Sequence, residues 1–414
     1  MKHRTPLTAL VISSGISSAG SAMTLIAVPW FVLDTTGSGA RTGLTAGVEM
    51  LGLFASVALA GPLVDRYGAR RTSIVADLFT VAMVAGIPLT HATTGLSFPA
   101  LLALAFGIGL GRAPSRSARS VLLPETITLA GVPVQRGASA QEGALSAGNL
   151  LGAPIGGALI AVVGPTNVLL LDAATLLTAA ALVALLVPIG RRPAPEPATA
   201  GIRGYLRELS QSVEYVRKDR LLLVVGLLCA GTNALFAGLS SVLIPALGKT
   251  VWHDSALAGS LIAAMGAGGL VGTLLYGWLG PRLKRWPTFC ASFLLAGPPT
   301  YLVLALDLPP VLLVAFVAAC AIGNGPLNPV LAGLKFDRVA VEFRGRVFGA
   351  LHALAIAASP VGTMTAGLLL DLAGPRTAVA VMGVMFVGLM LCPLIFPVWR
   401  KMDDPPLVPA TAVS

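Results

Sequence analysis

Charged side chains are scarce in this chain. Of its 414 residues, 28 are Lys or Arg and 18 are Asp or Glu, so only 11% are charged. A soluble globular protein carries about 25%. A soluble fold of this length needs more polar groups to cover its surface. The composition excludes a soluble enzyme, a nucleic-acid binder and a disordered chain, and it predicts an integral membrane protein.

Cysteines and motifs for catalysis are also few. The four cysteines lie inside apolar runs, with no CxxC pair and no His/Cys cluster. We therefore expect neither a metal site nor a disulfide framework. The sequence contains no GxxxxGK[ST] loop, no HExxH and no Ser/His/Asp arrangement. We expect no enzyme activity and no cofactor, and an ion gradient must supply the energy for any transport.

Long apolar runs dominate what is present. A helix needs about 20 apolar residues to cross a bilayer, and strands of a membrane barrel would instead be short and alternating. The first run follows the basic N-terminus and is predicted to be a transmembrane helix, not a signal peptide, because similar runs follow it. The sequence predicts an all-α membrane protein with twelve transmembrane helices. The runs are 7–33, 43–64, 72–90, 98–120, 138–163, 166–189, 221–248, 255–280, 287–306, 309–333, 345–370 and 375–398.

Basic residues fix the predicted orientation. With the N-terminus inside, 25 of the 28 Lys and Arg residues fall at the inner side, and only Arg41, Lys249 and Arg376 fall outside. Cytoplasmic loops carry such an excess of basic residues. We expect a multi-pass protein of the cell membrane with both termini in the cytoplasm. The net charge of +10 is a signal of topology, not of nucleic-acid binding.

The chain divides into two similar halves. Gly143-Ala-Leu … Ala153-Pro-Ile-Gly156 recurs as Gly349-Ala-Leu … Ser359-Pro-Val-Gly362. Two pseudo-symmetric six-helix bundles would enclose a cavity near the bilayer midplane, which is typical of secondary transporters. The predicted parts are an N-terminal bundle (1–190), a cytoplasmic linker (191–220), a C-terminal bundle (221–400) and a cytoplasmic tail (401–414).

A glycine-rich, basic loop lies between the second and third runs. It resembles the loop 2–3 motif of the major facilitator superfamily, and the resemblance implies that it forms a cytoplasmic gate. Arg70 could pair with Glu125 below the fourth run and hold the two bundles together; alternatively, the arginines act only as topological signals. The motif residues are Gly61, Asp65, Arg66, Gly68, Arg70 and Arg71.

The fifth run resembles the motif of drug:proton antiporters, although its proline falls one residue late. Glycines four residues apart on one helix face allow a second helix to approach closely, and close packing is the prediction from the residues themselves. The resemblance is greatest to the branch with Tap-type multidrug pumps, macrolide pumps and siderophore exporters, and it implies antiport. The motif residues are Gly148, Gly152, Pro154, Gly156 and Gly157.

Four acids lie inside predicted spans, where an ionisable group indicates function. A carboxyl group held away from water can load and release a proton near neutral pH. The candidates for proton coupling are Glu49, Glu142, Asp172 and Asp77. Glu49 ranks first because no basic residue is obvious at its depth. Arginines at 112, 116 and 119 form a stripe that could neutralise Asp77 or Glu142.

Polar residues in the predicted spans are candidates for the substrate cavity, although most such residues only bond between helices. Arg112 either binds an anionic group of the substrate or balances an acid. The candidates are Ser17, Ser21, Arg112, Asn149, Asn233 and Asn324.

Together these features predict a proton-coupled exporter of amphipathic, drug-like molecules that works by alternating access. The alternatives are a dedicated exporter of one endogenous metabolite, such as a siderophore or an antibiotic, an uptake carrier, and a transport-dead membrane receptor. The expected partners are a small-molecule substrate, protons and the lipid bilayer, without nucleic acid, and the expected oligomeric state is a monomer.

Overall fold

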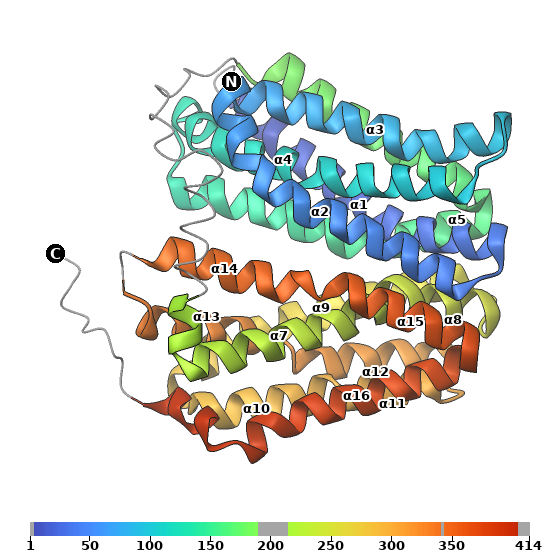
Figure 1. Ribbon diagram of the computed structural model, residues 1–414. Coiled ribbons are helices and arrows are strands. Elements are labelled where there is room, and N and C mark those ends of the chain that lie inside the picture. The colour runs from blue at the N-terminus through green and yellow to red at the C-terminus, as the bar shows by residue number, and fades with distance from the viewer. Residues whose placement is uncertain (1–3, 189–213, 341–342, 405–414) are drawn as a thin grey trace. The chain divides into compact units, whose positions relative to one another are not determined.

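The chain folds into long helices. No strand occurs in residues 4–188, 214–340 and 343–404, which the computed structural model describes (Figure 1). Most of the predicted linker (191–213) and of the predicted tail (405–414) lies outside these residues. The all-α fold predicted from the sequence is therefore confirmed.

The first half of the chain forms five helices. They are α1 (Thr5–Thr36), α2 (Gly39–Tyr67), α3 (Ala69–Thr93), α4 (Phe98–Ala130) and α5 (Val134–Leu186).

The second half is more interrupted. Its elements are α7 (Arg220–Gly238), the π-helix η1 (Leu239–Leu243), α8 (Ile244–Thr250), α9 (Ser255–Leu279), the 3-10 helix η2 (Gly280–Arg282), α10 (Arg285–Ala296), α11 (Pro298–Ala305), α12 (Pro310–Ile322), α13 (Leu327–Arg338), α14 (Arg344–Ala357), α15 (Ser359–Ala373), α16 (Pro375–Ile395) and the 3-10 helix η4 (Pro397–Asp403).

Helix α5 contains a reversal at Gly164. Its 53 residues would extend about 80 Å as a straight helix, far more than a hydrocarbon core of about 30 Å. Gly164 adopts φ 80° and ψ 161°, a conformation that side chains disfavour, and Pro165 starts the next helix without needing an amide partner. The two parts of α5, before and after Gly164, therefore correspond to the fifth and sixth predicted spans.

The number of membrane crossings stays a prediction. Ten helices among the described residues are long and apolar enough to cross a membrane, and α2, bent between Val57 and Leu59, would be an eleventh. These elements match the predicted apolar runs in order along the chain. A multi-pass membrane protein is the architecture that they define.

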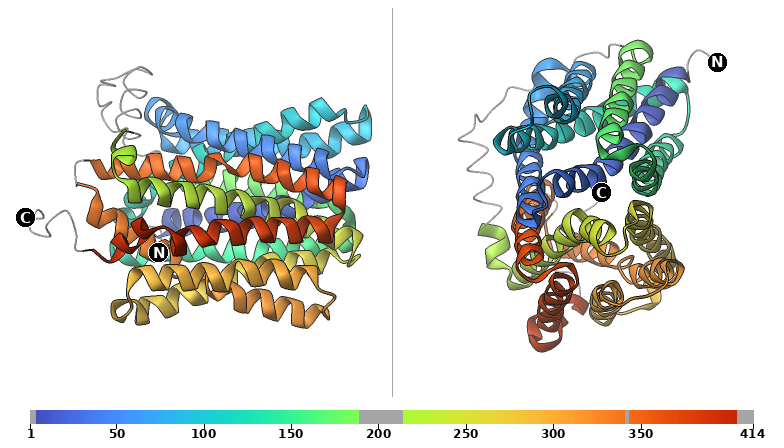
Figure 2. Two further views of the ribbon diagram at one scale, coloured as in Figure 1. Left: turned by 60° about the horizontal axis from the view of Figure 1, so that its bottom comes forward. Right: turned by 90° about the vertical axis from the view of Figure 1, so that its right-hand side faces the viewer.

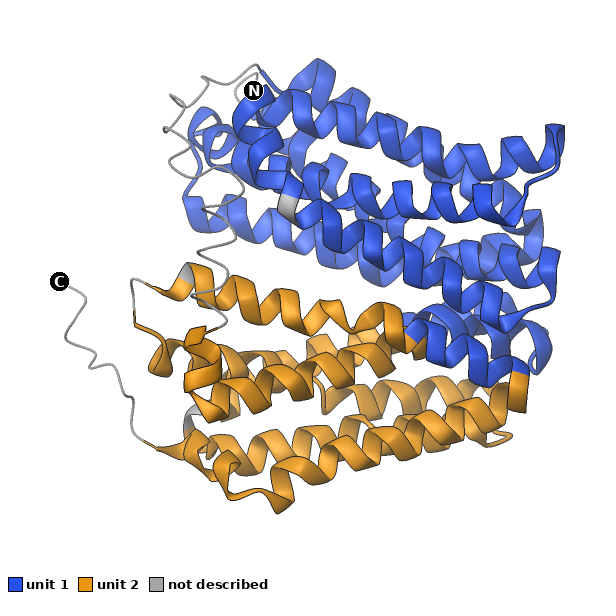
Figure 3. Cartoon of the chain, viewed as in Figure 1, with its two compact units in different colours: residues 1–197, 240–263, 363–371 blue, residues 198–239, 264–362, 372–414 orange. Residues whose placement is uncertain are grey.

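The described chain forms two compact units (Figure 3). Unit 1 contains residues 1–197 together with 240–263 and 363–371, and unit 2 contains the remainder. Within each unit the helices run roughly side by side, as the end-on view of Figure 2 shows. Unit 1 thus combines the N-terminal helices with two segments from the second half of the chain.

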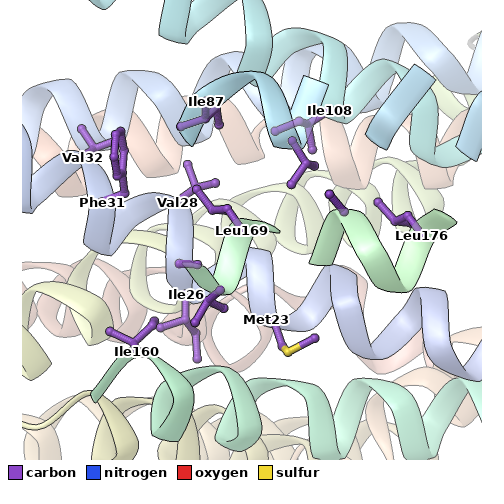
Figure 4. Close-up of a cluster of buried hydrophobic side chains, with 14 of the residues drawn as sticks. Met23, Ile26, Val28, Phe31, Val32, Ile87, Ile108, Ile160, Leu169 and Leu176 are labelled. Atoms are coloured by element: carbon purple, nitrogen blue, oxygen red, sulfur yellow. The ribbon is translucent and has the colours of Figure 1, made fainter. Parts of the chain in front are cut away.

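The main apolar core of unit 1 lies where α1 crosses α3, α4 and both parts of α5. Ile26, Val32, Ile87 and Leu169 are completely buried in it (Figure 4). A lipid-facing helix gains little from burying apolar groups in protein, so close packing has to stabilise such a core. Large apolar side chains such as Val162 and Leu185, each 82% exposed, instead cover the outside.

The contact between α1 and the first part of α5 depends on glycine. A Cβ atom at Gly148, Gly152 or Gly156 would come within 3.0 Å of Gly15, Ala19 or Met23 on α1. This spacing of four residues lets the two backbones touch. The close packing predicted for this stretch is what the structure shows.

Gly152→Ala should therefore destabilise the protein. Its new methyl group would press on the backbone oxygen of Ala19, and overpacking of this kind costs about 1–3 kcal/mol. Thermal unfolding in detergent should show a melting temperature lower by a few degrees. Gly143→Ala on the same helix is the control, since no atom lies within 4 Å of a Cβ there. Equal melting temperatures for the two variants would contradict the account.

Candidate functional site

Two buried ion pairs connect the helices of unit 1. Arg112 Nη1 on α4 lies 2.8 Å from Glu49 Oε1 on α2, and their side chains are 20% and 8% exposed. Arg119, two turns further along α4, lies 2.6 Å from Asp77 on α3. Ser115 donates a second hydrogen bond to Asp77, at 2.6 Å. Helix α4 thus carries the cations that balance acids on two neighbouring helices.

Asp172, in the second part of α5, has no ion-pair partner among the described residues. It is 1% exposed and accepts hydrogen bonds from Thr24 of α1 and from Thr175. Gly20 of α1 provides the space, because a Cβ atom there would overlap the Asp172 carboxylate. Arg112 and Glu49 both lie close enough to act electrostatically on Asp172. Glu49, Arg112 and Asp172 therefore form one charge cluster, which we call the acid–arginine cluster.

Local sequence brings this cluster together. A Cβ atom at Gly109 of α4 would come within 3.0 Å of the Glu49 carbonyl, and one at Gly52 of α2 would meet the Phe106 carbonyl. With glycine at both positions, α2 and α4 approach closely. Arg112 follows Gly109 by three residues, on the same side of α4, and so its guanidinium reaches Glu49.

The structure corrects one expectation about these acids. Glu49 does have a basic residue at its depth, namely Arg112, which pairs with it and not with Asp77 or Glu142. Glu142 is exposed on the first part of α5. The predicted pairing of Asp77 with the arginine stripe is present, through Arg119.

The gate motif lies at the junction of α2 and α3. Gly68 has φ 83°, which favours glycine, and it joins the two helices without a loop. Arg70 donates a hydrogen bond to the carbonyl oxygen of Ala184 on α5. Asp65 and Glu125 are both exposed, and the predicted pair between Arg70 and Glu125 is absent from this arrangement of the described residues.

Three of the six predicted cavity residues, Arg112 among them, bond to a neighbouring helix. Asn149 accepts a hydrogen bond from Ser18 at 2.8 Å, and Asn233 donates to Ala355 O at 3.2 Å. Ser17, Ser21 and Asn324 are half-buried. The structure brings Asn149 near α1, whereas Asn233 and Asn324 belong to the other unit.

A further set of contacts closes unit 1 at the end where α1 stops and α2 starts, here called the far end. Asp371 of α15 accepts hydrogen bonds from Ser38 Oγ at 2.8 Å, Ala40 N at 2.9 Å and Gly39 N. It thereby caps the N-terminus of α2 from a position 332 residues away in sequence. The sequence indicates only that Asp371 ends a helix, because no local pattern reveals such a distant partner.

Two more contacts belong to this far-end cluster. Lys249 of α8 lies 2.6 Å from Asp34 of α1. Ser255 of α9 donates a hydrogen bond to Gly157 O at 2.8 Å, where the two backbones touch. The far-end cluster, defined by Asp34, Ser38, Lys249, Ser255 and Asp371, therefore holds second-half segments on the N-terminal helices of unit 1.

No group of three or more His, Cys, Asp or Glu residues that could hold a metal ion occurs in the described part of the chain. Several buried polar residues of unit 1 instead form ion pairs or hydrogen bonds between helices. Paired charges at the centre of a helical membrane bundle are the arrangement found in carriers for ions and small molecules. The fold and the site define a multi-pass secondary transporter.

Comparison with known proteins gives the family. The model of the Major Facilitator Superfamily matches residues 10–248 and again 226–413. The chain belongs to the major facilitator superfamily. The double match agrees with the internal repeat found in the sequence.

Known relatives are efflux proteins. The chain is 31% identical to the multidrug efflux pump Tap of Mycobacterium tuberculosis, over 98% of this chain and 96% of that protein. It is 25% identical to the macrolide efflux protein A of Streptococcus pyogenes, over 94% and 95%. Among solved structures, the nucleoside transporter NupG has a similar fold, with a TM-score of 0.75, 12% identity and coverage of 95% and 98%. The branch that the motifs resemble is thereby confirmed.

The pairing of Glu49 with Arg112 predicts a non-additive double-mutant cycle. Arg112→Met alone leaves a buried carboxylate uncompensated, which costs about 3–5 kcal/mol, whereas the double variant Arg112→Met/Glu49→Met should recover much of this loss. Thermal unfolding in detergent compares the wild type, Arg112→Met, Glu49→Met and the double variant, the four proteins that the cycle requires. The exposed pair of Glu214 and Lys218 is the control and should give a coupling below about 1 kcal/mol. Additive effects for Glu49 and Arg112 would contradict their direct interaction.

Proposed function

We propose that this protein exports amphipathic, drug-like compounds across the cell membrane in exchange for protons. Efflux is supported by the relatives of known name, a multidrug pump and a macrolide efflux protein, which match nearly the whole chain. The distribution of basic residues supports an orientation with both termini in the cytoplasm. In that orientation the far end of unit 1 is the extracellular side.

The observation that carries the proton-coupling part is the acid–arginine cluster. One cation, Arg112, pairs with Glu49 of α2 and also acts electrostatically on Asp172 of α5. A proton that binds Glu49 would neutralise its carboxylate and abolish its attraction for Arg112. The Arg112 guanidinium would then interact with Asp172 instead. Movement of one buried cation between two acids changes the contacts of α2, α4 and α5 together. Such a change can be coupled to a conformational transition.

The four acids then have different roles. Glu49 remains the first candidate for the proton site, with Asp172 as the acid that gains the cation. Asp77 is neutralised by Arg119 and accepts a hydrogen bond from Ser115, which favours a structural role. Glu142 is exposed and lies outside the cluster.

Alternating access requires the extracellular side to open, and the far-end cluster is the structure that must separate. In this proposal its hydrogen bonds and its ion pair stabilise the outward-closed state. Separation would release the N-terminus of α2 and the Lys249 ammonium to water, where the lost interactions are replaced at small cost. The loop 2–3 motif lies at the opposite end, where a pair between Arg70 of α3 and Glu125 of α4 would join two helices of the N-terminal half and not the two halves of the chain.

Everted membrane vesicles test the coupling. Addition of a transported compound should release protons from acidified vesicles that contain the wild-type protein. Glu49→Gln should lower this release by at least about tenfold, as expected when a proton-transfer group is lost, while Glu49→Asp should retain part of it. Glu214→Gln, an exposed acid outside the membrane, is the control. Proton release by Glu49→Gln at the wild-type rate would show that Glu49 is not the coupling site.

The role of the far-end cluster is tested by Asp371→Asn. Both oxygens of Asp371 accept hydrogen bonds, and asparagine would replace one of them with an NH2 group, so the loss of that acceptor should cost about 1 kcal/mol and raise the outward-open population about fivefold. A cysteine at Thr363, which is buried beneath Gly43, reports this opening by its reaction with a membrane-impermeant maleimide in a background without other cysteines. Asp307→Asn is the control. Asp307 is another exposed acid that pairs with an arginine, but it lies outside the cluster, so its loss should leave the rate of maleimide reaction unchanged. Equal rates of maleimide reaction in the Asp371 and Asp307 variants would show that Asp371 does not hold the extracellular side closed.

A further inference from the structure

The 3-10 helix η4 packs against the start of α10, at the end of unit 2 where α16 stops (Figure 1). Two of its side chains are buried: Trp399 is 1% exposed and stacks on Phe289, and Met402 is 0% exposed. Asp403 accepts hydrogen bonds from two backbone amides at the N-terminus of α10, at 2.7 and 3.2 Å. These contacts fix η4 on α10.

Arg400 of η4 stacks on an aromatic ring of α10. Its guanidinium carbon lies 5.6 Å from the centre of the Trp286 ring. Trp286 is itself held in place, because its indole Nε1 donates a hydrogen bond to the carbonyl oxygen of Pro393 at 3.0 Å. A guanidinium that stacks on a fixed ring keeps its position, and its N–H donors stay available in its own plane.

Four exposed cations belong to η2, η4 and the residues before α10, and none of them forms an ion pair with an acid in the described part of the chain. The acids at this end have other partners, because Asp337 pairs with Arg285 and Asp403 caps α10. Asp404 lies 4.0 Å from Arg338. Together with the stacked tryptophan, the four cations form the η4 patch, which consists of Arg282, Lys284, Trp286, Arg400 and Lys401.

Exposed apolar side chains adjoin the η4 patch along the chain. Trp278, near the end of α9, is 70% exposed, and Phe396, between α16 and η4, is 55% exposed. Leu283, just before α10, is 46% exposed. Large apolar groups exposed at the ends of spans mark the level where hydrocarbon gives way to headgroups, and tryptophan is enriched there. The cations of the η4 patch, which follow these residues in the chain, therefore lie at headgroup depth.

A role as a topological signal explains the number of these cations but not their arrangement. Basic residues orient a membrane protein through their number in short loops. That role requires neither the stacking of Arg400 on Trp286 nor the hydrogen bond that holds the indole. A guanidinium held in this way is suited to an anion that presents two oxygens, such as a phosphodiester.

We propose that the η4 patch binds an anionic phospholipid, with Arg400 and Lys284 contacting its phosphodiester and with Trp278 and Phe396 contacting its acyl chains. In the orientation predicted from the sequence, this end of unit 2 faces the cytoplasmic leaflet, whose anionic lipids attract cations close to the membrane. A bound lipid would join η4 to α10 and stabilise this end of unit 2. The inference goes beyond the proposed export function and does not depend on it.

Native mass spectrometry of the purified, delipidated full-length protein tests the site. The wild type should bind phosphatidylglycerol at least about tenfold more tightly than zwitterionic phosphatidylcholine. Arg400→Gln and Lys284→Gln should each weaken phosphatidylglycerol binding about fivefold, the effect of one cation at an anionic surface, and leave phosphatidylcholine binding unchanged. Arg400→Lys should keep most of the affinity, because it keeps the charge. Arg136→Gln, which removes an exposed cation of unit 1 on the same predicted side, is the control and should match the wild type.

Three results would overturn the inference. The first is equal affinity of the wild type for the two lipids, or unchanged phosphatidylglycerol affinity in Arg400→Gln. The second is an equal loss in Arg136→Gln, which would show a general effect of net charge. The third is displacement of the lipid by an equal concentration of inorganic phosphate, which would show a site for a soluble anion. None of these measurements involves transport, so their failure would leave the export proposal unaffected.

Discussion

The cost of an unpaired charge in hydrocarbon is the constraint on which the rest of this structure depends. It explains why so few charged residues enter the spans and why those that do are arranged as Glu49 with Arg112 and Asp77 with Arg119. Asp172 satisfies the same constraint with hydroxyl donors from Thr24 and Thr175.

A second requirement is close approach of backbones, since apolar burial contributes little between helices in lipid. Glycines on α4 and α5 bring α2 and α1 near enough for short side chains to bond across. Gly157 likewise lets α9 pack closely on α5, and Ser255 Oγ lies 2.8 Å from the Gly157 carbonyl oxygen. Small residues therefore position both the acid–arginine cluster and the far-end cluster, which lie at different depths along the same helices.

Much of this arrangement could be predicted from the sequence, because hydropathy, glycine spacing and the loop 2–3 motif are local patterns. Such local patterns predict the end of the fifth run before Gly164-Pro165 and the close packing along Gly148, Gly152 and Gly156. The pairing of Glu49 with Arg112 could not be predicted from the sequence. The two residues lie 63 positions apart, and the depth of a residue along a tilted helix cannot be read from its number. The capping of α2 by Asp371 and the exposure of Glu142 likewise depend on which faces meet in three dimensions.

Opening of the far-end cluster is the central claim of this account, and a distance measurement tests it most directly. Spin labels at Arg41 and Leu368, two exposed positions beside the cluster, report its separation by double electron–electron resonance in the reconstituted full-length protein. The account predicts one short distance at rest and a second, longer population when transported compound and acidic pH are both present. A single short distance under conditions in which the same labelled protein transports would contradict it.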